Sequence, residues 1–311
     1  MTVVAASVVL AGVPAAAVSA GSDSARRDEV AHLYVNEIMP ALDEPVGWTG
    51  SVAGCRVGTI SNDAQDATRS TVNALRALAG LDAVEFSAAL SKKAQAAALV
   101  YRANRNIVHD IPSSWDCFSD DARQAGKRSN IALGLGGATA VTAYVDDPGA
   151  ANSDVGHRRW LLYPPTTTMG SGSTSIAHAL WVIGPKARAG SYADPQWVSW
   201  PTAGYFPTQL EPGGRWSLSG DTTHDYDFGS AKVTVTNSAG KKLRVKVHRS
   251  IEGYGNDTLV WEVPGIRKAT GDDVRSYRVS VSGIVRDGST VSREYTVKLF
   301  DPVAWLEATQ R

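Results

Sequence analysis

The sequence has no net charge and no block of like charges. Its 311 residues include 31 Lys or Arg and 31 Asp or Glu, a formal net charge of +0. Nucleic-acid binding needs Lys and Arg clustered on one face, and a polybasic membrane-surface patch needs a similar cluster. We therefore exclude nucleic acid and anionic membrane surfaces as expected partners.

Cysteine is scarce, because Cys55 and Cys117 are the two in the chain. They lie too far apart for a C-x-x-C redox or zinc motif. An even, low number of cysteines in an exported protein usually forms disulfides, so we expect these two to pair. The bond would close a loop of about 60 residues and contribute roughly 4 kcal/mol in the chain-entropy model. Two buried free thiols are the alternative.

Long apolar runs are absent after residue 20. Residues 2–20 are small, apolar and uncharged, and they end in Ala17-Val18-Ser19-Ala20, a small-x-small pattern suited to signal peptidase. We predict a signal peptide over residues 1–20, and a secreted protein that is extracellular or cell-wall associated. No Lys or Arg precedes the run. A transmembrane anchor is the alternative, although the run is only just long enough to span a bilayer.

The common hydrolase motifs are also missing. The sequence has no G-x-S-x-G nucleophile elbow and no H-E-x-x-H metal motif. A histidine acting as a general base, or a serine beside a histidine, needs no such motif and stays possible.

The chain is long enough for roughly two domains of about 150 residues each. Apolar residues recur at helical spacing in the first half, and Ser87, and Ser119 or Asp120, are placed as helix caps. The predicted helices cover residues 24–41, 66–81, 87–105, 119–126 and 138–145, and the predicted strands cover 129–134, 176–184 and 197–200. This order indicates an α+β domain over residues 66–205, preceded by a helix and loop over residues 21–65.

From residue 206 the helical pattern disappears. Six or seven short strands within about 100 residues predict an all-β, immunoglobulin-like sandwich over residues 206–311. Trp216, Tyr254 and Trp261 lie in this region. A platform for glycan or protein is one interpretation of these aromatic residues, but aromatic residues in strands more often belong to a core.

Residues 146–172 bring many chemically useful side chains into one short stretch. Asp147-Pro148-Gly149 is typical of a turn. Asn152 or Ser153 can cap a short helix that carries His157. We therefore expect His157 to hold a fixed position, and a structural histidine is the alternative interpretation.

The same stretch contains two arginines and several late glycines. We expect Arg158 and Arg159 to be one surface residue and one partner in an ion pair with an acid such as Asp154. Gly170 and Gly172 allow the backbone to turn tightly or to pass close to another segment.

A series of short pieces stands in a characteristic order along residues 66–205. They are Val72-Asn73-Ala74-Leu75-Arg76, the Ala-rich segment 88–105, His109, Ser129-Asn130-Ile131-Ala132, Gly156-His157-Arg158, Trp160, Leu162-Tyr163-Pro164, Met169-Gly170-Ser171-Gly172 and the strand 179–183. Together they resemble the CAP superfamily (cysteine-rich secretory, antigen 5 and pathogenesis-related proteins) in its bacterial SCP-domain form. The resemblance implies an α-β-α sandwich with a central groove.

In this family the groove typically holds two histidines and two acids that can bind a divalent metal. By resemblance, His109 and His157 match the two histidines. Ser129 replaces one acid, and Asp147 matches the other, with Asp146 as a nearby alternative. Imidazole and carboxylate suit zinc, but a hydroxyl in place of a carboxylate removes charge and basicity. The resemblance therefore implies at most weak binding of a metal such as zinc by His109 and His157.

The expected function is that of a non-catalytic extracellular binding module. Its groove would take a small ligand such as a lipid, a peptide or a glycan, and we expect that groove to include His109, Ser129, Tyr144, Asp147 and His157, with Trp160 packed in the core. Tyr144 stands where the family usually has a tryptophan. Two alternatives remain. One is a metal-assisted or histidine-dependent hydrolase, and the other is an adhesive cell-wall protein that acts through its C-terminal β domain.

Overall fold

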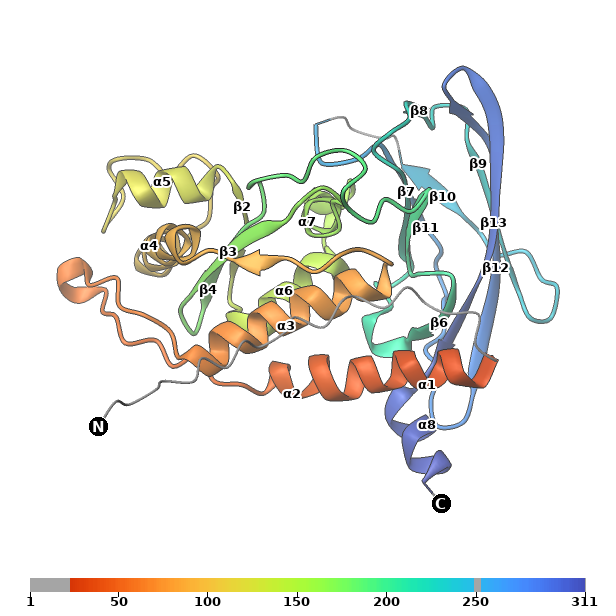
Figure 1. Cartoon of the computed structure of the whole chain (residues 1–311), viewed down its shortest axis with the longest axis horizontal. Coiled ribbons are helices and arrows are strands. Elements are labelled where there is room, and N and C mark those ends of the chain that lie inside the picture. Colours follow the sequence, from red (N-terminus) through yellow and green to blue (C-terminus); the bar gives the residue numbers. More distant parts are fainter. Residues whose placement is uncertain (1–22, 249–252, 311) are drawn as a thin grey trace, which may run out of the picture.

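The computed structural model describes residues 23–248 and 253–310, so the predicted signal peptide lies outside the described residues. The first described elements are α1 (Asp23–Leu33), a π-helical turn (Tyr34–Ile38) and α2 (Met39–Leu42). They confirm the predicted helix over residues 24–41. These helices run along one flank of the molecule, where α1 meets α8 (Pro302–Thr309) (Figure 1). Across the described part of the chain, no helix has the length and apolar character needed to cross a membrane.

A four-stranded sheet forms the centre of the first half. Its strands, in sheet order, are β1 (Glu85–Phe86), β3 (Thr168–Ser173), β4 (Ala177–Trp181) and β2 (Ser129–Leu133). Helices α4 (Ala88–Asn104) and α5 (Asp120–Gly126) pack on one face through one apolar cluster. Helices α3 (Asn62–Leu78), α6 (Gly137–Asp146) and α7 (Gly156–Leu161) pack on the other face through a second cluster. The predicted α-β-α sandwich is confirmed (Figure 1).

Serine caps set where the helices of this half begin. The hydroxyls of Ser87 and Ser119 accept hydrogen bonds from backbone N–H groups two or three positions into α4 and α5, as predicted. Ser61 caps α3 in the same way. Because this cap lies upstream of the apolar stripe, α3 begins at Asn62, earlier than the expected residue 66.

Helix α4 lies directly on strand β3. A Cβ atom on Gly172 would lie 2.0 Å from the backbone nitrogen of Gln95, and one on Gly170 would lie 2.6 Å from the nitrogen of Ser91. Both distances are well inside van der Waals contact, so these two positions require glycine for close approach. The alanines at residues 94 and 97 are fully buried on the facing side of α4. Small residues on both elements therefore bring helix and sheet together.

Two further sheets make up the second half. One contains β10 (Lys246–His248), β11 (Thr258–Glu262), β7 (Arg215–Gly220) and β5 (Trp197–Trp200). The other contains β6 (Gly204–Pro207), β13 (Ser289–Phe300), β12 (Val274–Arg286), β8 (Tyr226–Asp227) and β9 (Lys232–Asn237). The predicted β-rich C-terminal half is confirmed, while its likeness to an immunoglobulin domain stays a prediction.

Trp216 and Trp261 lie fully buried between these two sheets. The ring of Trp216 meets that of Tyr277 edge to face, with centroids 5.8 Å apart. Both tryptophans thus belong to the core, as their place in strands favours. Strand β5 pairs with β7, so strand pairing places residues 197–200 with the β-rich half although the sequence analysis grouped them with the first domain.

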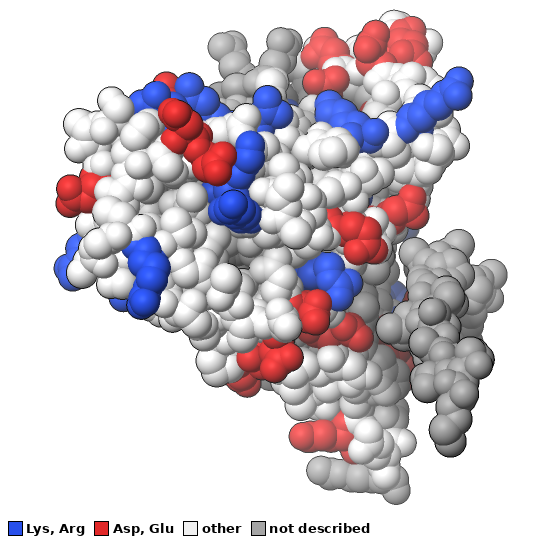
Figure 2. Space-filling view, turned by 60° about the vertical axis from the view of Figure 1, so that its left-hand side comes forward, with Lys and Arg blue, Asp and Glu red and all other residues white. Residues whose placement is uncertain are grey.

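The surface carries both signs of charge. On the face shown in Figure 2, basic and acidic side chains are interspersed, with wide uncharged areas between them. This agrees with the balanced composition of the chain.

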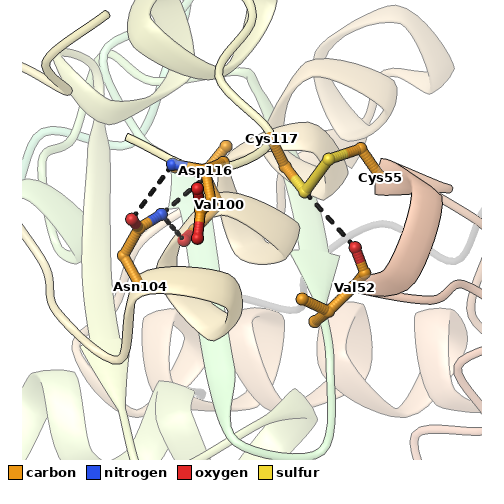
Figure 3. The surroundings of a disulfide bond; sticks show 6 residues. All are labelled: Val52, Cys55, Val100, Asn104, Asp116 and Cys117. Atoms are coloured by element: carbon orange, nitrogen blue, oxygen red, sulfur yellow. Dashed lines mark hydrogen bonds between the residues drawn. A yellow bond between two sulfur atoms is a disulfide. The ribbon is translucent and has the colours of Figure 1, made fainter. Parts of the chain in front are cut away.

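The disulfide between Cys55 and Cys117 is present and joins residues 62 positions apart. Figure 3 shows how the segment carrying Cys117 is also tied to α4, because Asn104 donates to the carbonyl of Asp116 and accepts from its N–H. The same segment begins near His109, so the disulfide and Asn104 hold its far end in place.

Candidate functional site

Helix α7 is capped by an acid from ten residues upstream. The carboxylate oxygen Oδ2 of Asp147 accepts the backbone N–H of His157 at 3.0 Å and that of Arg158 at 3.4 Å. The expected caps, Asn152 and Ser153, are not used, because Val155 occupies the N-cap position and makes no side-chain cap. A carboxylate at this point neutralises unsatisfied N–H groups and interacts favourably with the helix dipole.

The other oxygen of Asp147 holds the ring of His157. Oδ1 lies 2.7 Å from Nδ1 of His157, and Asp147 is completely buried. Because a carboxylate only accepts, Nδ1 carries the hydrogen. In the neutral ring, Nε2 then keeps a lone pair, and this atom has no hydrogen-bond partner among the described residues.

His109 is oriented in the same way by a different acceptor. It lies in the loop after α4 and its Nδ1 is 2.9 Å from the carbonyl oxygen of Gly126. A carbonyl also only accepts, so Nδ1 again carries the hydrogen and Nε2 is the atom left with a lone pair. Two histidines far apart in the sequence thus present the same ring nitrogen.

Both histidines line one cavity of about 360 Å³. Ser129, at the start of β2, lines it too, and its buried hydroxyl has no partner within the described residues. The structure therefore places His109, Ser129 and His157 around one cavity, and their role as a functional site stays a prediction. Trp160 packs against the core cluster, as expected, and its partly exposed side chain also contributes to the lining.

Tyr144 and Asp147 are not among the residues that line this cavity, and the expected groove set stays a prediction. Tyr144 is 2% exposed and lies behind His157, with ring centroids 5.4 Å apart. Its hydroxyl lies 3.1 Å from the carbonyl of Asn130 and 3.0 Å from Nδ1 of His178. The polar atoms of both residues are already bonded inside the protein. Tyr144 and Asp147 therefore hold His157 in place and are not free to bind a ligand.

Sequence reasoning missed His178. This histidine sits in β4, fully buried, with Nε2 3.0 Å from the hydroxyl of Ser171. Burial lowers its pKa to about 3, because the charged ring cannot be solvated there. The available signal was a polar residue inside an otherwise apolar strand.

Arg158 and Arg159 are both buried, so neither is the expected surface residue. The guanidinium of Arg158 donates to the carbonyls of Val145 and Asp146 and to the hydroxyl of Ser217 in β7. Burial lowers its pKa to about 10, which leaves it charged at neutral pH. The arginine therefore joins α7 to the β-rich half.

A second arginine, from the β-rich half, also joins that half to the segment around α7. Arg215 of β7 donates through Nη1 to the carbonyls of Asp147 and Gly149, both at 2.8 Å. Its Nη2 pairs with Glu262 at 3.1 Å. The loop that carries Asp147 is thus held by the β-rich half, and through Asp147 so is His157.

The donor set does not fit a resident metal. Across residues 23–248 and 253–310, no three His, Cys, Asp or Glu side chains come together as a metal site requires. Both oxygens of Asp147 are used by His157 and Arg158, and Ser129 offers only a neutral hydroxyl. Catalytic zinc sites usually have three protein ligands. Weak binding by His109 and His157 stays a prediction.

The family assignment follows from comparison with known proteins. Residues 69–182 match the model of the cysteine-rich secretory protein family, CAP. The chain therefore contains a CAP domain over residues 69–182, and its β-rich C-terminal half lies outside the matched residues. The match includes His109, Ser129 and His157. No curated protein matches the chain.

Proposed function

We propose that this CAP-domain protein is an extracellular, non-catalytic binding module whose groove takes a small ligand. The observation that carries the proposal is the shared cavity. There His109 and His157 each have Nδ1 bonded to the protein, while Nε2 has no partner among residues 23–248 and 253–310. The cavity volume of about 360 Å³ lies within the usual range of small-molecule sites, roughly 300–1,000 Å³.

The groove is organised before any ligand arrives. Asp147 is buried and fixes the tautomer and orientation of His157, and the carbonyl of Gly126 does the same for His109. Preorganised polar groups cost less entropy when they bind. The Cys55–Cys117 disulfide and the predicted signal peptide support an extracellular or cell-wall location.

A thermal-shift experiment tests this function. We would add palmitate, tetra-alanine or a tetrasaccharide of N-acetylglucosamine to the full chain without its signal peptide. Since a ligand at 100 times its Kd stabilises the folded state by about 2.7 kcal/mol, at least one probe should raise the melting temperature. His157→Ala and His109→Ala should reduce that rise, and His32→Ala, on exposed α1, should not. A rise unchanged in both groove variants, or no rise with any probe, would contradict the proposal.

A histidine-dependent hydrolase is the second candidate, and a specific observation favours it. Asp147 orients His157 much as an acid orients the histidine of a catalytic triad. Ser129, whose hydroxyl has no partner among the described residues, lines the same cavity. Hydrolysis of p-nitrophenyl acetate would be measured with EDTA present. Turnover that Ser129→Ala and His157→Ala both abolish, in folded protein, supports the hydrolase, and turnover equal to that of the free buffer rejects it.

A further inference from the structure

We propose that the ligand of this groove is an uncharged oligosaccharide, and that Tyr254 of the β-rich half provides the surface on which a sugar ring stacks. The inference rests on the binding function proposed above. It adds the chemical class of the ligand and a binding residue that lies outside the matched CAP segment, residues 69–182.

Tyr254 reaches the groove from the far half of the chain. It lies between Gly253 and Gly255, whose φ angles of 94° and 61° turn the backbone sharply on either side of it. A Cβ atom on Gly156 would lie 3.3 Å from the Tyr254 ring, so the ring rests on the first residue of α7, next to His157. It lines the same cavity as the two histidines and is 42% exposed.

The Tyr254 ring is held against α7 and yet stays partly exposed, as a binding surface would be. Its contact with α7 covers one part of the ring, and the guanidinium of Arg159 lies 5.7 Å from its centroid. The residue is nevertheless 42% exposed and lines the cavity. Tyrosine combines a flat apolar ring with a polar hydroxyl, which matches a ligand that has an apolar face edged by polar groups. A pyranose ring has that shape and chemistry.

The charge of the lining favours an uncharged ligand. Among residues 23–248 and 253–310, the charged side chains of the lining are Lys127 and Asp154. Lys127 already pairs with Asp110 at 3.0 Å. An anionic ligand would have to compete for the lysine, and a cationic ligand would find a single carboxylate.

The other residues of the lining favour a sugar over a lipid as the ligand. Within the described part of the chain, its larger aliphatic side chains are Val182 and Ile183, which offer little surface to an acyl chain. The polar atoms are better matched to hydroxyl groups, which both donate and accept. Such hydroxyl groups can donate to Nε2 of His109 and His157 when these rings are neutral. Trp160 adds a second aromatic side chain to the lining.

Isothermal titration calorimetry on the full chain without its signal peptide tests the inference. The probes are β-1,4-linked tetrasaccharides of N-acetylglucosamine and of glucose, with palmitate and tetra-alanine as comparators. We expect a tetrasaccharide to bind, and Tyr254→Ala to weaken it about tenfold, which equals about 1.4 kcal/mol. Tyr254→Phe keeps the ring and should bind within about threefold of the original protein. Val247→Ala removes an exposed side chain of the same half that does not line the cavity, and it should change nothing.

The outcomes separate this inference from the function on which it rests. Saccharide binding that Tyr254→Ala leaves unchanged overturns the role of Tyr254. Binding of palmitate or tetra-alanine alone, lost in His157→Ala, overturns the sugar assignment and leaves the binding function standing. If no probe binds, or if the bound probe is indifferent to both His157→Ala and Tyr254→Ala, the inference and the proposed function both fail.

Discussion

At the scale of single residues, Asp147 performs two tasks with one carboxylate. One oxygen caps α7 and the other fixes His157. Asp147→Asn keeps the shape but puts an N–H₂ group where one of these donors points. A buried donor left without a partner costs about 1–3 kcal/mol, and we expect a loss of that size in the free energy of unfolding, measured with urea.

The neighbouring acid provides the control for this prediction. Asp146 is exposed, so Asp146→Asn should change stability by no more than about 0.5 kcal/mol. Equal effects of the two substitutions would show that the Asp147 carboxylate has no special role.

The buried His178 predicts a pH dependence at the same scale. Its pKa is lowered to about 3 by burial, whereas the unfolded chain has a pKa of about 6.5. Below pH 6.5 His178 therefore binds a proton in the unfolded state but not in the folded state. The free energy of unfolding therefore falls as the pH falls. Between pH 6.5 and pH 5 this contributes about 2 kcal/mol of lost stability. His178→Gln should flatten the stability curve over this range by that amount, and an unchanged slope would be evidence against it.

At the scale of elements, strand β7 holds the loop that precedes α7. Arg215 bonds two carbonyls of that loop and Arg158 reaches back to Ser217. Hydrogen bonds to charged groups contribute about 1.5–3 kcal/mol, so Arg215→Ala should destabilise the protein by that amount. Amide hydrogen exchange should accelerate most at His157 and Arg158, whose N–H groups depend on Asp147. Arg278→Ala, on exposed β12 surface, is the matched control, and equal acceleration in both variants would refute the coupling.

At the scale of the whole molecule, the two halves share one apolar core. A single buried cluster includes Val72 and Leu75 of α3, Trp216 of β7 and Val297 of β13. We therefore expect one cooperative transition in calorimetry of the full chain, because neither half can unfold without exposing surface of the other. Two resolved transitions, or an isolated fragment 206–311 that unfolds cooperatively, would show independent domains instead.

The sequence predicted most of what depends on neighbouring residues. Ser87 and Ser119 cap helices a few residues away, and the glycines of β3 marked a close approach that the structure contains. The two groove histidines were found because family motifs carry them. Sequence reasoning failed where contacts are distant in the chain. Nothing local indicates that Arg158 inserts against Ser217, since that contact joins residues 59 positions apart.

The same reason explains the errors at the site. Asn152 and Ser153 have better local positions for capping α7, but Asp147 is folded back onto it from a left-handed turn at φ 51°. Tyr254 was considered as part of a separate β domain, because only the folded chain places it against Gly156.

The most direct test of the central claim is nitrogen-detected NMR of the histidine rings. In the free protein, the neutral rings of His109 and His157 should carry the hydrogen on Nδ1 and the lone pair on Nε2. Adding the N-acetylglucosamine tetrasaccharide, palmitate or tetra-alanine should shift both Nε2 signals together for the probe that binds, and leave exposed His32 unmoved. Shifts at only one groove histidine, or the opposite tautomer in the free protein, would contradict a shared cavity with two oriented imidazoles.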